Sequence, residues 1–140
     1  MTEQTKTPNV LIVDDDVDTG IFVSTLFESN GYQPVVTRDG GSGLAKAREV
    51  NPDLIVLDLM MPGDGGVEMY RALKSDPALV KTPVIMLSSV ARKTFSHYLK
   101  VLNVRNDDMP PGLDTYIEKP PDARELMELA NRLIGQIKAM

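Results

Sequence analysis

The sequence predicts an α/β protein built around a parallel β-sheet. Three observations favour this fold class. Short apolar runs such as NVLIV, DLIVLDL and TPVIMLSS are typical of strands buried on both faces of a sheet. Segments with the helical spacing of apolar residues separate these runs along the chain. This alternation implies parallel strands joined by right-handed crossovers, and 140 residues suit one domain with its own core.

The first strand and the first helix are predicted at residues 9–13 and 17–30. The helix carries apolar residues at roughly helical spacing, namely Val17, Ile21, Phe22, Leu26 and Phe27. Asn30-Gly31 ends it, because glycine accepts the left-handed backbone that closes many helices. Residues 1–8 are polar and end in a proline, so we expect a flexible N-terminal tail.

The middle of the chain predicts two strands and one helix. QPVVT at 33–37 is the second strand, and a helix follows over 41–49. The helix stops before Asn51-Pro52, because a residue that precedes proline disfavours the helical backbone. DLIVLDL at 53–59 is the third strand. The next segment, MMPGDGG, contains one proline and three glycines and therefore predicts a turn.

The last part of the chain predicts the remaining elements. Helices are expected at 66–74, 92–103 and 122–138, and strands at 82–89 and 115–118. A long polar loop, 104–114, precedes the last strand. The final helix has an apolar stripe at the spacing i, i+3, i+4, i+7, i+11, formed by Leu126, Leu129, Ala130, Leu133 and Ile137.

Composition excludes several classes of protein. Without cysteine the chain has no disulfide framework, thiolate metal site or cysteine nucleophile. The N-terminus lacks the apolar run of a signal peptide and no segment has the length of a membrane span, so we expect a cytoplasmic protein with no membrane partner. The net charge of −5 and the lack of a basic run argue against direct binding of nucleic acid.

Polar residues follow the carboxyl ends of four predicted strands. They are Asp14, Asp15 and Asp16 after the first strand, Asp58 at the end of the third, Ser88 at the end of the fourth and Lys119 after the fifth. A parallel sheet brings these ends to one edge, where ligands of open α/β sheets bind. Adjacent carboxylates repel one another and lose solvation when buried, so a positive group must compensate them.

The predicted cluster suits Mg²⁺ and phosphoryl transfer. Carboxylate oxygens without histidine or cysteine favour a hard cation, which offsets their repulsion and bridges to phosphate oxygens. A carboxylate held beside Mg²⁺ and a lysine is placed to attack phosphorus and form an aspartyl-phosphate. This transfer needs alignment and charge stabilisation more than acid–base chemistry.

Four motifs, in this order and spacing, resemble the receiver domain of two-component response regulators over residues 9–138. They are LIVDDD for the acidic pair, LIVLDLMMPGDGG around the phosphoacceptor, PVIMLSS for the switch hydroxyl and YIEKP for the lysine. The resemblance implies a flavodoxin-like (βα)5 three-layer sandwich, with a five-stranded parallel sheet in the order 2-1-3-4-5.

The resemblance also implies a role for each matching acidic residue. Asp58 accepts the phosphoryl group. Asp14 and Asp15 organise Mg²⁺, with Asp15 as the direct ligand. Asp58 itself and the backbone carbonyl of Met60 complete the protein ligands of the metal.

A switch is the further implication of the resemblance. Ser88 hydrogen-bonds the attached phosphoryl group, Lys119 pairs with it from the other side, and Tyr116 turns inward when the Ser88 segment moves. The face formed by the fourth helix, fifth strand and fifth helix then changes, for binding of a downstream protein or for phosphorelay. The same face could also form a homodimer. The donor would be a sensor histidine kinase or a phosphotransfer protein.

The sequence ends shortly after the last helix, so we expect a stand-alone receiver without an output domain. Such a protein catalyses only its own phosphorylation and dephosphorylation and is not otherwise an enzyme. One departure from the family is the long separation of Ser88 and Lys119, by 31 positions, whose extra residues fall around 103–114. Because long loops in compact domains are often functional, we expect this loop to influence partner choice.

Three other functions compete with this interpretation. A Mg²⁺-dependent phosphohydrolase with an aspartate nucleophile typically has a second acidic residue two positions later, where this chain has Met60. A pseudo-receiver, which binds partners without being phosphorylated, usually lacks an acidic residue or the lysine, and here all are present. A nucleotide-binding flavodoxin-like domain needs a glycine-rich phosphate loop after the first strand, and none follows Val13.

Overall fold

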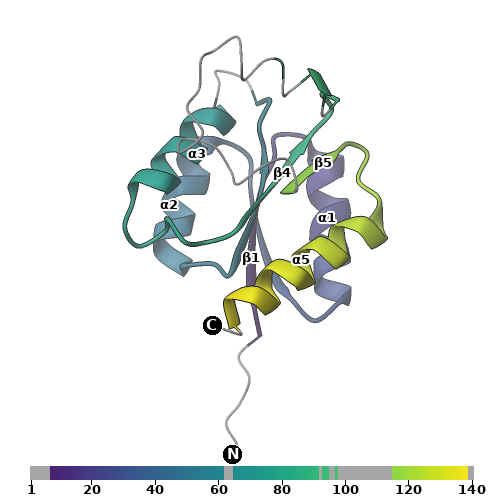
Figure 1. Ribbon diagram of the computed structural model, residues 1–140, viewed down its shortest axis with the longest axis horizontal. Coiled ribbons are helices and arrows are strands. Elements are labelled where there is room, and N and C mark those ends of the chain that lie inside the picture. Colours follow the sequence, from purple (N-terminus) through teal and green to yellow (C-terminus); the bar gives the residue numbers. More distant parts are fainter. Residues whose placement is uncertain (1–6, 62–64, 92, 95–96, 98–114, 139–140) are drawn as a thin grey trace, which may run out of the picture.

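The computed structural model describes residues 7–61, 65–91, 93–94, 97 and 115–138. Within them, five parallel strands form one sheet in the order β2-β1-β3-β4-β5, with helices on both faces (Figure 1). The strands are β1 (Asn9–Val13), β2 (Gln33–Thr37), β3 (Leu54–Asp58), β4 (Val84–Ser88) and β5 (Tyr116–Glu118). The helices are α1 (Val17–Ser29), α2 (Gly40–Val50), α3 (Gly65–Ser75) and α5 (Ala123–Lys138). This flavodoxin-like arrangement confirms the predicted fold class and strand order.

Two apolar cores lie on opposite faces of the sheet, because successive side chains of a strand point in opposite directions. Val10 and Ile12 of β1 pack in the core that includes residues of α1 and α5. Leu11 and Val13 pack in the core that includes residues of α2 and α3. Figure 1 shows these two pairs of helices on the two sides of the sheet. Burial on both faces explains why the strands are uniformly apolar.

The predicted elements agree with the described helices and strands to within two residues at each end. Three predictions cannot be compared in this way. The loop at 104–114 and residues 1–6 of the predicted tail lie outside the described residues, as does the helix at 92–103 apart from residues 93–94 and 97. No helix in the described parts of the chain is both long enough and apolar enough to cross a membrane.

Two left-handed residues end helices. Gly31 has φ +89°, as expected of the glycine that closes α1. Asn51 closes α2 with φ 50°, and its N–H donates to the carbonyl of Ala47. The stop before Pro52 was expected, but the left-handed Asn51 was not. Proline disfavours the α conformation at the residue before it, and asparagine tolerates the left-handed alternative better than most residues.

The apolar spacing of helix α1 identified only part of the face that packs on the sheet, namely Phe27 and the partly buried Leu26. The buried residues of this helix are Gly20, Val23 and Phe27. Three of the apolar residues that predicted the helix, Val17, Ile21 and Phe22, are instead exposed by 44%, 59% and 44%. The helix therefore presents apolar surface to solvent immediately after the carboxyl end of β1.

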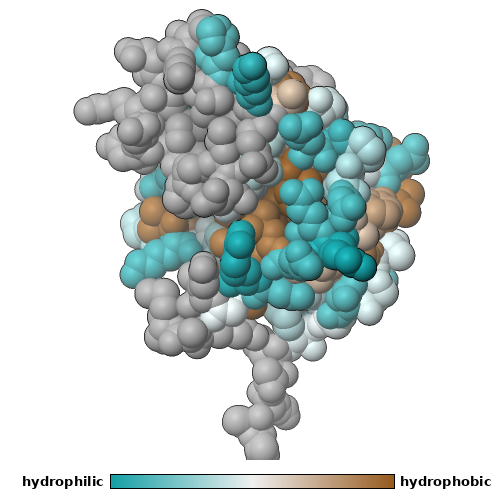
Figure 2. All heavy atoms as spheres, turned by 45° about the vertical axis from the view of Figure 1, so that its right-hand side comes forward, coloured by the Kyte–Doolittle hydropathy of each residue, from teal (hydrophilic) through white to brown (hydrophobic). Residues whose placement is uncertain are grey.

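The predicted stripe on α5 is the face that packs on the sheet. Leu126, Leu129 and Ala130 are buried, and Leu133 is partly buried against the same core. Figure 2, which brings the right-hand side of Figure 1 forward, shows hydrophilic side chains beside an area of apolar surface on this face.

Candidate functional site

Strand register brings two predicted site residues together. Val13 of β1 pairs with Leu57 of β3, so the next residues, Asp14 and Asp58, end two neighbouring strands side by side. These strands also mark the point where the chain changes faces, because α1 follows β1 onto one face and α3 follows β3 onto the other. Open α/β sheets bind ligands in the crevice at such a switch point.

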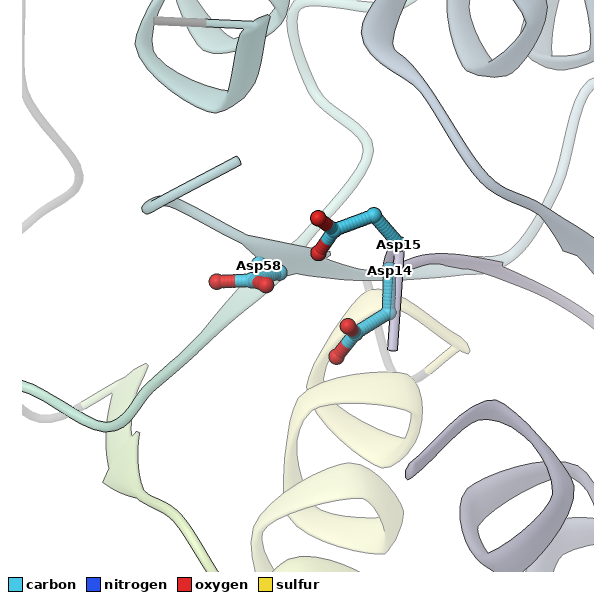
Figure 3. A group of neighbouring side chains, drawn as sticks. All are labelled: Asp14, Asp15 and Asp58. Carbon is cyan, nitrogen blue, oxygen red and sulfur yellow. The ribbon is translucent and has the colours of Figure 1, made fainter. Parts of the chain in front are cut away.

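Three carboxylates meet at this edge. Asp14, Asp15 and Asp58 each offer an oxygen, and these atoms lie within 4.8 Å of one another. Figure 3 shows Asp14 and Asp15 coming from the end of β1 and Asp58 from the end of β3. Asp14 and Asp58 are buried, whereas Asp15 is exposed. The group is therefore a metal-binding candidate with one side open to solvent.

Asp16, the third aspartate of the run, is the N-cap residue of α1. Its carboxylate caps α1, accepting hydrogen bonds from the N–H of Asp18 at 3.2 Å and the hydroxyl of Thr19 at 2.7 Å. The bond from Thr19 holds the pKa of Asp16 below its usual range. The helix cap accounts for this side chain without a role in metal binding.

Lys119 bridges the two buried carboxylates. Its Nζ lies 3.0 Å from Asp14 Oδ2 and 3.2 Å from Asp58 Oδ2. Its backbone N–H donates to the carbonyl of Ser88 at 2.8 Å, which fixes it beside β4. Burial alone would lower the pKa of Lys119, but the hydrogen bond and charge of Asp14 and the charge of Asp58 outweigh it and raise that pKa. The lysine is therefore a permanent positive charge in the site.

Asp14 is costly to keep ionised in the metal-free site. Burial raises its pKa to about 6, and the charge of Asp58 adds to this effect. The N–H of Asp16, which donates to Asp14 Oδ1 at 2.9 Å, and the ammonium of Lys119 oppose the rise without cancelling it. A further cation at this position would favour the carboxylate form.

The donor set and its spacing fit a small hard cation. Mg²⁺ prefers six oxygen ligands at roughly 2.0–2.1 Å, which places neighbouring ligand oxygens about 3 Å apart and opposite ones about 4 Å apart. Oxygens of Asp14, Asp15 and Asp58 within 4.8 Å of one another reach that arrangement with small movements. The backbone of Met60 is close as well, because its N–H donates to Asp58 Oδ1 at 3.0 Å. The assignment of the Met60 carbonyl as a metal ligand stays a prediction.

Gly66 is a structural determinant that sequence reasoning recognised only as part of a turn. A Cβ on this residue would lie 2.3 Å from the carbonyl oxygen of Asp58 and 2.6 Å from Cα of Leu59. Only glycine therefore allows the first turn of α3 to rest on the end of β3. One feature of the sequence pointed to this role. Gly66 stands at the start of the predicted helix 66–74, where no glycine is needed to make a turn.

The two predicted switch residues both bond to the backbone of Val90. The Ser88 hydroxyl accepts a hydrogen bond from the N–H of Val90 at 3.1 Å, and the Tyr116 hydroxyl donates to the carbonyl of Val90. Ser88 and Tyr116 are each 1% exposed. Tyr116 is thus turned inward, and the switch roles of the two residues stay predictions.

The family model of the response regulator receiver domain matches residues 10–131. The chain belongs to this family. The match covers the ends of β1, β3, β4 and β5, and therefore every residue of the site. The acidic group of this receiver domain is compatible with Mg²⁺ and with an aspartyl-phosphate.

Known receiver domains share both sequence and fold with this one. The DNA-binding response regulator MtrA of Mycobacterium tuberculosis is 34% identical over 84% of this chain and 46% of its own length. The receiver domain of a Francisella response regulator is 32% identical, with a TM-score of 0.75 over 94% of this chain and 99% of that one. Chemotaxis protein CheY4 of Vibrio cholerae is 26% identical, with a TM-score of 0.76 over 91% and 99%.

The receiver domain spans about half the length of the bacterial regulators that it matches, 46% of MtrA and 53% of the Escherichia coli regulator PhoB. The expectation that nucleic acid is not a partner gains no support here, because MtrA is described as DNA-binding. Receiver domains act with histidine kinases and downstream targets, so signalling partners are a property of this family.

Replacing Asp14 by Asn should stabilise the metal-free receiver domain at pH 7 by about 1–3 kcal/mol, since one pKa unit corresponds to about 1.4 kcal/mol. The folded state binds the Asp14 proton more tightly than the unfolded state, because burial raises this pKa from 3.8 to about 6. The advantage of Asp14→Asn should therefore shrink as the pH falls from 6 towards 3.8 and vanish below that window. Urea unfolding in a chelator at pH 7 and pH 5 measures both effects.

Asp16→Asn is the matched control, because asparagine caps helices as well as aspartate and this side chain is exposed. Its stability should stay close to that of the wild type at pH 7. An Asp14→Asn protein no more stable than wild type at pH 7 would contradict the assigned cost of ionising Asp14.

Gly66→Ala should destabilise the fold by about 1–3 kcal/mol, the usual cost of forcing an extra methyl into a packed contact. Its Cβ would meet the backbone of Asp58 and Leu59. Gly65→Ala is the control, because the nearest atom to its Cβ lies at 3.7 Å, and it should stay within about 0.5 kcal/mol of wild type. Equal urea midpoints for the two variants would refute the contact.

Proposed function

We propose that this receiver domain accepts a phosphoryl group on Asp58 and passes the signal on through a change in its protein-binding surface. The observation that carries the proposal is the arrangement around Asp58. A buried carboxylate lies 3.2 Å from the ammonium of Lys119 and shares a metal-binding group with Asp14 and Asp15. This is a set of charges suited to an incoming phosphoryl group and not to a simple structural ion pair.

Both oxygens of Asp58 are held before any reaction. Oδ1 accepts from the N–H of Met60 at 3.0 Å, and Oδ2 accepts from Lys119 Nζ at 3.2 Å. In the transfer, an Asp58 oxygen forms a bond to phosphorus while the bond from phosphorus to the donor breaks, so Asp58 needs no proton transfer. Lys119 pairs with the oxygens of the bound phosphoryl group. Mg²⁺ held by Asp14, Asp15, Asp58 and the Met60 carbonyl would neutralise charge on the same oxygens.

The phosphoryl donor is a phosphohistidine of a sensor histidine kinase or a phosphotransfer protein. This donor protein docks on α1. The exposed apolar residues Val17, Ile21 and Phe22 begin directly after the acidic run. Exposed apolar surface beside a site indicates a protein contact, because single domains normally leave such residues scattered. The docked partner would face the open side of the acidic group.

The output is a switch that runs through the Val90 peptide. When Asp58 carries a phosphoryl group, the Ser88 hydroxyl donates to one of its oxygens. That movement repositions the peptide of Val90, to which Tyr116 is bonded. The face affected is the one expected from the predicted fourth helix together with β5 and α5, and it serves a downstream protein or a second copy of the receiver domain.

Acetyl phosphate should add one phosphoryl group to the protein only when Mg²⁺ is present. The reason is that the metal and Lys119 together offset the charge of the acidic group. Intact-mass measurement with Mg²⁺, with a chelator, and with Asp58→Asn tests this, and the variant should show no gain. A mass gain that persists in Asp58→Asn would place the phosphoryl group elsewhere. No gain in any condition would favour a receiver that binds partners without phosphorylation.

Ile21→Asn should slow phosphotransfer from a histidine kinase at least about tenfold, the effect of removing an apolar anchor from an interface. Ile21 is 59% exposed, so the change should leave the fold intact. Phosphorylation by acetyl phosphate should be unchanged, because that donor needs no docking surface. Val80→Asn, at an exposed apolar residue between α3 and β4, is the matched control. Equal kinase rates for Ile21→Asn and wild type would remove α1 from the interface.

A further inference from the structure

A second cavity lies at the edge of the sheet opposite Asp58. Its volume is about 270 Å³, and it is lined by the start of β4, by the connection from α3 to β4 and by Thr115, which precedes β5. Residues of α3 and α5 close its sides. None of the described residues that line it belongs to the acidic group, so the cavity is separate from the phosphorylation site.

Two residues that line this cavity, Tyr70 and Thr115, carry buried hydroxyls without a partner among the described residues. Tyr70 Oη and Thr115 Oγ1 have no hydrogen bond within the described structure, although the two residues are exposed by only 2% and 6%. Nearly all buried polar side chains of proteins are paired, because an unpaired one keeps the cost of leaving water. Burial raises the pKa of Tyr70, so its hydroxyl stays protonated and can donate. No described residue supplies a partner for either hydroxyl.

Two lysines add positive charge to the same cavity. Lys74 Nζ donates to the carbonyl of Val80 at 3.1 Å and lies 5.4 Å from the centre of the Tyr70 ring, which leaves further N–H groups for a ligand. Lys81 lines the cavity from an exposed position. Burial lowers the pKa of Lys74, and an anion beside it would oppose that effect. None of the described lining residues is acidic.

The remaining wall is apolar. Pro83, Val84 and Leu133 line it. We propose that the cavity binds a small organic anion, with its charged group against Lys74 and Lys81 and its apolar part against this wall. The hydroxyls of Tyr70 and Thr115, which are buried just behind this lining, complete the contacts once their side chains rotate towards the ligand. Water could pair the hydroxyls but would gain nothing from the apolar wall, and the volume lies just below the range of typical ligand pockets, about 300–1,000 Å³.

Titration of the full chain with three probes tests the proposal. Benzoate and phenylphosphonate supply the two common anionic groups, and benzyl alcohol is a neutral control of similar size. Amide chemical shifts are recorded by NMR in a chelator, so that the acidic group cannot recruit an anion through a metal. We expect saturable shifts at Thr82 and Thr115 with one or both anions, with Kd on the order of millimolar for such small probes.

The comparison of the probes decides the chemistry. The tighter of the two anions identifies a carboxylate or a phosphoryl ligand. Absence of saturable shifts with both anions would overturn the proposal and leave a cavity that holds only water. Equal binding of benzyl alcohol would overturn the assignment of an anion.

Variants then locate the binding. Lys81→Gln and Thr115→Val should each weaken the anion at least about threefold, since one removes a charge and the other removes a hydroxyl. Thr115→Val should fold normally, because it replaces an unpaired buried hydroxyl by a methyl of the same shape. Lys46→Gln, at a lysine on α2 outside the cavity, should leave the affinity unchanged. Unchanged affinity in both cavity variants would place the probe elsewhere and refute the site.

Discussion

One ammonium group makes the acidic site possible. Lys119 Nζ lies 3.0 Å from Asp14 and 3.2 Å from Asp58, and without it two buried carboxylates would face each other across neighbouring strands. Lys119 follows β5, at the edge of the sheet, whereas the carboxylates end β1 and β3 in its middle. The ion pairs therefore form only when β4 and β5 are in register with β3. The site is therefore complete only when the whole sheet has formed.

The site still lowers the stability of the fold. Burial keeps the pKa of Asp14 raised despite Lys119, so keeping this carboxylate ionised at neutral pH costs folding free energy. Burial of apolar side chains in the two cores on either side of β1 and β3 offsets this cost. Such an excess of negative charge is what a cation-binding site requires, because a neutralised cluster would have no affinity left for the ion.

Much of this structure was readable from the sequence, since apolar runs ending in Asp14, Asp58 and Ser88 depend only on local patterning. The features that were missed depend on contacts between distant segments. The place of Gly66 at the start of a predicted helix is a weak signal, and it does not identify the backbone of β3 as the surface on which α3 rests. The exposed Ile21 has the spacing of a core residue, and only the packed helix reveals which face is buried. The two unpaired hydroxyls near the cavity opposite Asp58 belong to Tyr70 of α3 and to Thr115, which precedes β5.

The backbone of Val90 couples the two predicted switch residues, Ser88 and Tyr116. Its N–H binds Ser88 and its carbonyl binds Tyr116, and these two groups belong to neighbouring peptide planes joined at a single Cα. A rotation about the backbone of Val90 that follows one side chain therefore misaligns the other. The positions of Ser88 and Tyr116 therefore both depend on the backbone conformation of Val90 and do not change independently. This dependence keeps the number of arrangements of the two side chains small.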